Sequence, residues 1–364
     1  MAPKEAGSLI SQANTIIGRI HLWSPDGFLN GVDLAVPVPP RCCARVEEFF
    51  MSIIKSADVA YVRLQVPDLD VSEQFLVDFG LIPAGRDAKH RYFRSSDPAP
   101  YCYVISQGER KFLGFAFHAK SQADLETLSS ATGVAIESID GPCGGLRVRL
   151  QEPDGYDVDV VFGMKAYERI VVKRQAVNTG DEPLKRAGEL YRLDGSKPTP
   201  IKRLAHVVMG TTDIVRTSKW FKDTLGVIAS DDIVVGPNKN LMASFMRIDM
   251  DDAYVDHHAL FLLQYDFAGL QHISFEVPDF DAVMADHDYL KQLDRYEHVW
   301  GIGRHLLGAQ VFDYWLDPFG IPHEHWADSD RLNNTAATNT WDPKDSLISQ
   351  WGGHSPEKFR VVIP

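Results

Sequence analysis

Hydrophobic and polar positions along this chain switch between two periods, and the switches predict short strands followed by helices. Residues 61–66, YVRLQV, alternate as a half-buried strand does. Residues 67–70, PDLD, have turn composition, and residues 71–80 have helical spacing and end at a glycine. Before residue 57 no clear period is present. The regular part of the fold is therefore expected to begin near residue 57.

The same pattern of strand, turn and helix recurs later in the chain. The segments YVRLQVPDLDVSEQFLVDFGL from Tyr61 and HVVMGTTDIVRTSKWFKDTLGV from His206 align without a gap, at an offset of 206 − 61 = 145 residues. A second pair is FAFHAKSQADL from Phe115 and ISFEVPDFDAV from Ile273, and a third is QEPDGYDVD and LDPFGIPHE. Three matches in the same order indicate an internal duplication.

Each half of the duplication contains two copies of a sequence pattern that predicts one strand, then a helix, then further strands. The strands are too short and too amphipathic for a doubly wound parallel sheet. We therefore predict an α+β fold in which antiparallel strands curve into a half-open barrel with helices outside.

The predicted domain order follows from the repeats and from the composition between them. It is an N-terminal extension at residues 1–56, an N-terminal domain at 57–165, a charged linker at 166–200, a C-terminal domain at 201–330 and a tail at 331–364. Two tryptophans in the tail suggest that it docks on the body.

Composition narrows the functional classes. The 364 residues are 45% hydrophobic and 24% charged, as in ordinary soluble proteins, and no apolar run approaches the ~20 residues of a membrane span. The net charge of −13 argues against a nucleic-acid surface. Without a secretory signal, a cytoplasmic location is expected. The four cysteines form no C-x-x-C pair and are expected to be free thiols: Cys42, Cys43, Cys102 and Cys143.

Three residues of the C-terminal half suggest a metal centre. His206 and His272 each lie on the first strand of a module, 272 − 206 = 66 residues apart, and Glu324 lies on the last strand. Two imidazoles and one carboxylate are the facial ligand set of non-haem iron(II). A lone histidine on an apolar strand is more often structural, and Glu324, between two histidines, could also sit on an exposed edge strand. Three such residues at equivalent points of a repeated module favour the metal.

The N-terminal half serves as an internal control. The positions that match the three candidate ligands are Tyr61, Gly114 and Asp159, so two of the three ligand types are missing there. We therefore expect one half to bind metal and the other to have a structural or oligomer-forming role.

A run of residues in the last module resembles a known family. Gly303-Arg304-His305 is followed by Tyr314 after 314 − 305 = 9 residues, and Glu324 follows Tyr314 after 10 more. The segment Asp317-Pro318-Phe319-Gly320 lies between Tyr314 and Glu324. The whole stretch resembles the signature of the type I extradiol ring-cleavage dioxygenases of the vicinal oxygen chelate superfamily. The turn at 317–320 is expected to aim the strand of Glu324.

The segment Asp256-His257-His258-Ala259-Leu260-Phe261 of this chain resembles a second motif of the same family. His258 stands 14 residues before His272 and His257 stands 15 before it, so spacing alone does not choose between them. The position of the functional histidine in the family's doubled pair favours His258. The resemblance covers roughly residues 57–330 and implies the vicinal oxygen chelate fold, with two βαβββ modules in each domain.

The resemblance also implies a chemistry. His206, His272 and Glu324 would bind Fe(II), or less often Mn(II), and a catechol-type diol and O2 would meet at the metal. His258 would act as acid and base, Tyr314 would hydrogen-bond the substrate, and His305 would hold a catechol oxygen. The chain would be a ring-cleaving dioxygenase of aromatic catabolism and a homo-oligomer, with no nucleic-acid or membrane partner.

Other functions remain open at this point. A glyoxalase or epimerase of the same fold would use the metal for proton transfer without oxygen, and a 4-hydroxyphenylpyruvate type of dioxygenase would use a keto acid. A binding protein without chemistry is a third possibility. The remaining histidines that match no motif, His287, His298 and His354, are interpreted as surface residues.

Overall fold

The computed structural model describes residues 51–364 except 173, 175, 181–183, 189–193 and 361–362. Most of the predicted N-terminal extension therefore lies outside the described residues, as do Cys42, Cys43 and part of the predicted linker. Cys102 and Cys143 are free thiols, as predicted. Residues 53–56 pair through their backbone with the end of helix α3 (Ile214–Leu225).

Two large sheets carry the fold, one from each half of the chain. The first has the order β2-β3-β4-β1-β5-β8-β7-β6 and the second the order β19-β10-β11-β13-β9-β14-β17-β16-β15-β20. The strands of the first sheet are β1 (Val59–Val66), β2 (Ile82–Arg86), β3 (His90–Arg94), β4 (Tyr103–Gln107), β5 (Lys111–His118), β6 (Ile136–Ser138), β7 (Leu146–Gln151) and β8 (Asp157–Phe162).

The second sheet takes its strands from the C-terminal half and the tail. They are β9 (Arg203–Thr211), β10 (Val227–Val235), β11 (Asn240–Ile248), β13 (Leu260–Gln264), β14 (Gly269–Glu276), β15 (Glu297–His305), β16 (Val311–Leu316), β17 (Pro322–Ala327), β19 (Asn339–Trp341) and β20 (Ser349–Trp351). A small additional sheet pairs β12 (Val255–Asp256) with β18 (Arg331–Leu332).

Strand direction differs in part from the prediction. The two modules of each half meet through an antiparallel central pair, β1 with β5 and β9 with β14. Within each module, however, the first and last strands are parallel, as in β1 with β4 and β14 with β17. The helix that follows the first strand supplies the crossover that a parallel pair requires. The sheets are therefore mixed, and the prediction of antiparallel strands holds for only part of the strand pairs.

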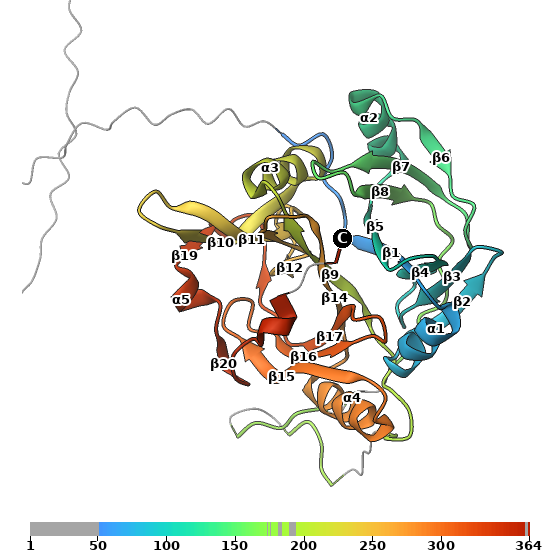
Figure 1. The fold of residues 1–364 in the computed structure, drawn as a ribbon, viewed down its shortest axis with the longest axis vertical. Helices are drawn as coiled ribbons and strands as arrows, with labels where there is room; N and C mark the ends of the chain where they lie inside the picture. Colours follow the sequence, from blue (N-terminus) through green and yellow to red (C-terminus); the bar gives the residue numbers. More distant parts are fainter. Residues whose placement is uncertain (1–50, 173, 175, 181–183, 189–193, 361–362) are drawn as a thin grey trace, which may run out of the picture. The chain divides into compact units, whose positions relative to one another are not determined.

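The longer helices of the described residues lie on the outer sides of the sheets (Figure 1). They are α1 (Leu69–Asp78), α2 (Gln122–Thr132), α3 and α4 (Phe280–Leu293), and the tail adds α5 (Pro343–Ser346) and a 3-10 helix, η1 (Glu357–Arg360). Each long helix begins after a side chain that caps its first turn, and these caps are Asp68, Ser121, Asp213 and Asp279. The predicted helix from about Ile214 ends where Gly226 adopts a left-handed conformation, with φ of 67°.

The strand registers agree with the predicted duplication. Glu324 pairs with Ser274 on β14, and Asp159 pairs with Ala116 on β5. Ser274 in turn pairs with His206, and Ala116 with Tyr61. The predicted α+β class and the four βαβββ modules are therefore present in the structure.

The tail is part of the C-terminal sheet. Strand β19 extends one edge by pairing with β10, and β20 extends the other by pairing with β15. One hydrophobic cluster runs through both halves of the chain and includes Phe75, Tyr103, Phe275 and Trp315. Among the described residues, no helix has the length and apolar character needed to cross a membrane.

Candidate metal and catalytic site

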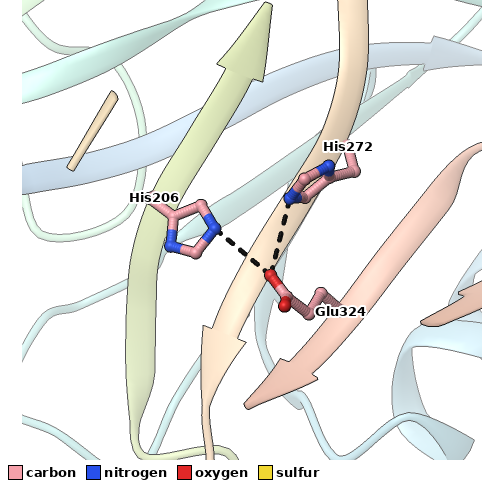
Figure 2. Close-up of side chains that lie close together, drawn as sticks. All are labelled: His206, His272 and Glu324. Atoms are coloured by element: carbon pink, nitrogen blue, oxygen red, sulfur yellow. Dashed lines mark ion pairs between the residues drawn. The ribbon is translucent and has the colours of Figure 1, made fainter. Parts of the chain in front are cut away.

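Three adjacent strands bring the predicted ligands together. His206 lies on β9, His272 on β14 and Glu324 on β17, and these strands are neighbours in the sheet. The Nε2 atom of His206 lies 3.2 Å from Oε2 of Glu324, and Nε2 of His272 lies 3.5 Å from the same oxygen (Figure 2). One ligand atom from each residue falls within 4.8 Å of the others, and all three side chains are buried.

Two neighbouring side chains orient this group. Gln271 accepts a hydrogen bond from Nδ1 of His272, which leaves Nε2 of that ring facing Glu324. Ser274 donates a hydrogen bond to Oε2 of Glu324. Outer hydrogen bonds of this kind fix the tautomer and the ring orientation of metal-binding histidines. Sequence reasoning missed Gln271 and Ser274, although both flank His272 in the chain.

The protonation states suit a cation. Burial alone would raise the pKa of Glu324, but the neighbouring imidazoles of His206, His272 and His305 lower it well below its usual value. Burial lowers the pKa of His272 to about 4. The carboxylate is therefore ionised and the His272 imidazole is neutral at physiological pH, which are the forms that ligate metal ions.

The group fits a divalent metal ion by its unsatisfied atoms. Nε2 of His272 and Oε1 of Glu324 are buried and have no hydrogen-bond partner. A buried polar atom without a partner is costly, and a metal ion bound between the three side chains would satisfy both atoms. Two imidazoles and one carboxylate leave further coordination positions open, as a catalytic site requires.

The three residues predicted to act on the substrate, His258, His305 and Tyr314, lie around this group. The rings of His258 and His206 have centroids 4.1 Å apart. Nε2 of His305 lies 2.9 Å from the hydroxyl of Tyr314 and 3.7 Å from Oε1 of Glu324. Burial raises the pKa of Tyr314 well above its usual value, and the negative charge of Glu324 raises it further. Burial, followed by the nearby imidazoles, lowers the pKa of His258 well below its usual value.

A cavity of about 390 Å³ opens onto the group. His206, His272, His258, His305 and Tyr314 line it, whereas His257 does not. The other walls are mainly apolar and include Met242, Phe245, Phe261, Leu263, Trp300 and Leu307. Of the described residues that line the cavity, none is a lysine or an arginine.

The tail closes part of this cavity, which sequence reasoning did not anticipate. Leu347, Ile348 and Phe359 lie on its wall. The backbone oxygen of Phe359 also accepts a hydrogen bond from Gln271, the residue that orients His272. Sequence reasoning also missed two other residues that line the cavity, Trp300 and Gln310. Nε1 of Trp300 and Nε2 of Gln310 are buried and have no hydrogen-bond partner.

Glu324 does not lie on an exposed edge strand. β17 has β14 on one side and β16 on the other, and the flanking His323 and His325 are fully buried. His323 hydrogen-bonds the hydroxyl of Tyr103 at 2.9 Å, and His325 stacks on Phe79 with ring centroids 3.7 Å apart. Alternation along the strand therefore directs Glu324 toward His206 and His272, and its two neighbours toward the N-terminal half.

Two of the histidines interpreted as surface residues are instead partners of a buried acid. Asp313 on β16 is fully buried and lies 3.1 Å from Nδ1 of His287 and 2.8 Å from Nε2 of His298. Nε1 of Trp315 donates a third hydrogen bond to it at 2.6 Å. Three donors satisfy this carboxylate, so the cluster ties α4 to β15 and β16. His354 is exposed, as expected.

Known proteins resemble this chain in sequence and in structure. No protein-family model matches it. Metapyrocatechase 2 from Cupriavidus necator is 29% identical over 309 residues, which are 83% of this chain and 90% of that protein.

Solved structures share the fold. Homoprotocatechuate 2,3-dioxygenase from Brevibacterium fuscum, in complex with 3,4-dihydroxyphenylacetate, has a TM-score of 0.66 and 23% identity, and the match covers 85% of this chain and 94% of that one. The 2,3-dioxygenase LapB from Pseudomonas sp. KL28 has a TM-score of 0.65 and 19% identity, covering 81% and 100%. A Mn(II)-bound glyoxalase from Novosphingobium aromaticivorans has a TM-score of 0.69 and 22% identity, covering 84% and 94%.

The fold and the candidate site together define a class. The chain has the vicinal oxygen chelate fold, and its predicted resemblance to the type I extradiol dioxygenases is confirmed by the sequence relative and by the dioxygenase structures. The relatives that are named as a metapyrocatechase and as dioxygenases support the prediction of an oxidoreductase. These relatives imply a catalytic metal, for which His206, His272 and Glu324 form a fitting group.

Proposed function

We propose that this chain cleaves the ring of a catechol-type substrate next to its diol with O2, and that Fe(II), or alternatively Mn(II), is the metal. The observation that carries this proposal is the two-histidine, one-carboxylate group, whose two histidines line a mainly apolar cavity. The named relatives support it, because they include a metapyrocatechase and two ring-diol dioxygenases.

His206, His272 and Glu324 would hold the metal, which when bound would supply open positions for the diol and for oxygen and would allow electrons to pass between them. The remaining chemistry belongs to side chains of the chain itself. These side chains orient the diol, accept and return its proton, and keep water out.

His258 is the proposed proton acceptor. It lines the cavity beside His206, and its lowered pKa keeps the imidazole unprotonated before substrate binds. A neutral imidazole within reach of a catechol hydroxyl can take its proton and later return it. The cavity-lining position of His258, which His257 lacks, supports the choice between the two histidines.

Tyr314 and His305 are proposed to hold the substrate oxygens. Because its pKa is raised, Tyr314 stays protonated and can donate a hydrogen bond to a charged oxygen of the diol. In this proposal the Nε2–H of His305, 2.9 Å away, donates to the hydroxyl oxygen of Tyr314 and leaves the tyrosine proton free for the diol. Both residues line the cavity.

The cavity supports a neutral, apolar substituent on the catechol ring. Met242, Phe245, Phe261 and Leu263 would pack against it. A carboxylate substituent would find no lysine or arginine among the described lining residues, and an unpaired buried charge costs several kcal/mol. The lining of the cavity therefore favours an apolar substituent over a carboxylate.

A matched pair of substrates tests the proposal. The chain is purified anaerobically, loaded with Fe(II), and given 4-ethylcatechol or 3,4-dihydroxyphenylacetate, which are similar in size and differ in charge. Oxygen consumption and a yellow ring-opened product are expected with 4-ethylcatechol, with a kcat/KM about 100-fold above that for the acid. Absence of oxygen consumption with every catechol tested would refute the dioxygenase proposal, and a preference for the acid would refute the substituent class.

The glyoxalase structure makes proton transfer without oxygen the main competing function. A glyoxalase would convert the hemithioacetal of methylglyoxal and glutathione under anaerobic conditions. We expect no such turnover, because Gly114 leaves the N-terminal half without a counterpart of His272, and the spacing from His305 through Tyr314 to Glu324 resembles the dioxygenase signature. Anaerobic turnover of the hemithioacetal without oxygen uptake on catechols would favour the competing function.

A further inference from the structure

We propose that Asp231 and His257 form a positioning pair that fixes the tautomer of His258, so that the cavity-facing nitrogen of His258 carries a lone pair. This inference rests on the proposed function, in which His258 accepts the substrate proton. It assigns a role to the second histidine of the doubled motif and to an acid that matches no motif.

The three side chains form a continuous hydrogen-bonded row. Nδ1 of His258 lies 3.1 Å from Nδ1 of His257, and Nε2 of His257 lies 2.6 Å from Oδ2 of Asp231. Both histidines are 3% exposed and Asp231 is 5% exposed. Because all three side chains are buried, solvent does not compete for these hydrogen bonds. The two imidazole rings are nearly perpendicular, with an interplanar angle of 88°.

The direction of each hydrogen bond follows from the acid. An ionised carboxylate can only accept, so Nε2 of His257 must carry its proton. In the neutral His257 ring, Nδ1 is then an acceptor, and the proton of the 3.1 Å contact belongs to Nδ1 of His258. Nε2 of His258 is left without a proton and is the nitrogen that can act as a base toward the cavity.

The backbone around His257 is held in place. Its carbonyl oxygen accepts a 2.6 Å hydrogen bond from the hydroxyl of Ser230, and its N–H donates to the backbone oxygen of Asp330 at 3.0 Å. The ring therefore has little freedom to turn away from Asp231. Packing of the side chain against Phe245, with ring centroids 5.5 Å apart, restricts it further.

The tail completes the row on the far side of Asp231. Nε1 of Trp341 and Nδ2 of Asn339 donate hydrogen bonds to Oδ1 of Asp231 at 2.8 and 3.0 Å, so Oδ2 is left for His257. Burial would raise the pKa of Asp231, but the hydrogen bonds from His257, Trp341 and Asn339 lower it, and the acid stays ionised. Strand β19 thus supplies the donors that keep the acceptor in place.

The first test compares two adjacent acids on β10. Asp231→Asn can present an N–H to His257 and reverse the row, whereas the matched control Asp232→Asn alters a side chain that accepts from Ser244 at 2.7 Å and does not contact His257. We expect Asp231→Asn to lower kcat about 100-fold with KM and bound iron unchanged. Asp232→Asn should stay within about twofold of the parent chain, and Asp231→Glu should recover part of the lost kcat. An unchanged kcat in Asp231→Asn, or an equal loss in Asp232→Asn, would overturn the proposal.

The second test reads the tautomer without turnover. The full chain labelled with ¹⁵N-histidine is studied by long-range ¹H–¹⁵N correlation NMR, and the His258 signals are assigned by their loss in His258→Gln. His258 should be protonated at Nδ1 in the parent chain and in Asp232→Asn, and should change tautomer in Asp231→Asn. If catechols are not cleaved but the tautomer behaves in this way, the proposed function fails and the positioning pair stands. A proton on Nε2 in the parent chain would refute the pair even if catechols are cleaved.

Discussion

The two halves of the chain bury a carboxylate at the same point of the same module but give it different partners. In the C-terminal half, Glu324 faces two imidazoles and Tyr314, and in the N-terminal half Asp159 faces Tyr61 and Arg149. The register makes these positions equivalent, because Tyr314 pairs with Glu324 as Arg149 pairs with Asp159.

The N-terminal carboxylate is already neutralised by the protein. Nε and Nη2 of Arg149 donate to Asp159 at 2.7 and 3.0 Å, and the hydroxyl of Tyr61 donates at 2.7 Å. The position that corresponds to His272 is Gly114, which pairs with Arg63 as His272 pairs with Val208. Gly114 has φ of +133°, and a Cβ there would lie 2.0 Å from the backbone oxygen of Asp157, so a histidine side chain cannot occupy it.

The comparison shows that the fold buries a carboxylate at the same module position in both halves, and that this carboxylate needs a positive partner. A guanidinium fills this role permanently in one half, and unpartnered ligand atoms leave the role to a metal in the other.

The largest effect is expected from removing the carboxylate in each half. Glu324→Ala should abolish metal binding and turnover, and His206→Ala and His272→Ala should do the same, because two remaining ligands cannot hold the ion firmly. Asp159→Ala, the equivalent substitution, should retain iron at the level of the parent chain. Metal analysis after anaerobic loading measures both, and equal iron loss in the two alanine variants would contradict the difference between the halves.

Removal of one hydroxyl should separate metal binding from chemistry. Tyr314→Phe should keep its iron, since the tyrosine is not a ligand, but lose turnover by about 10² to 10³-fold, as expected for a lost donor to a charged oxygen. Steady-state oxygen uptake and iron content are measured on the same sample. Iron loss in this variant would place Tyr314 among the ligands instead.

In the N-terminal half the corresponding loss should be one of stability. Asp159→Ala leaves Arg149 and Tyr61 without their buried acceptor and should lower the free energy of unfolding by about 2 kcal/mol, a value discounted because Arg149 is partly exposed. Replacing Asp159 and Arg149 together with leucine should recover part of this loss. Urea unfolding of the metal-free variants provides the measurement, and unchanged stability in Asp159→Ala would mean that the ion pair contributes nothing.

The smallest effect is a pH dependence of that ion pair. Burial would raise the pKa of Asp159, but the hydrogen bond and charge of Arg149 and the charge of Arg63 lower it below its ordinary value of 3.8. A lowered folded-state pKa gives stability that is present above the unfolded value and lost as pH falls through the folded one. The difference in unfolding midpoint between the parent chain and Asp159→Asn should therefore be constant near pH 6 and shrink below about pH 4. A difference that persists unchanged down to pH 3 would argue against the assigned pKa.

Local patterns in the sequence predicted much of the architecture. The duplicated phrase predicted the modules, because strand alternation and helix caps such as Asp68 and Asp213 are local features. The equivalence of Glu324 and Asp159 also followed from alignment of the repeats, and the registers agree with it. The roles of the candidate ligands and of the second-sphere residues remain predictions.

Features that depend on distant partners could not be predicted. His287 and His298 looked like surface residues because Asp313, their partner, lies on another strand, and Asp231 gave no signal because His257 lies 257 − 231 = 26 residues away. The burial of His323 and His325 depends on contact with the N-terminal half. The parallel pairs within modules and the tail strands at both sheet edges likewise depend on the assembled sheet.

Metal stoichiometry tests the central contrast between the halves most directly. The chain is purified anaerobically, loaded with excess Fe(II), freed of loosely bound ions by gel filtration and measured for iron and protein in the same fractions. One iron per chain is predicted, and it should be lost in Glu324→Ala and kept in Asp159→Ala. No retained iron, or two irons per chain with one lost in each variant, would contradict the account.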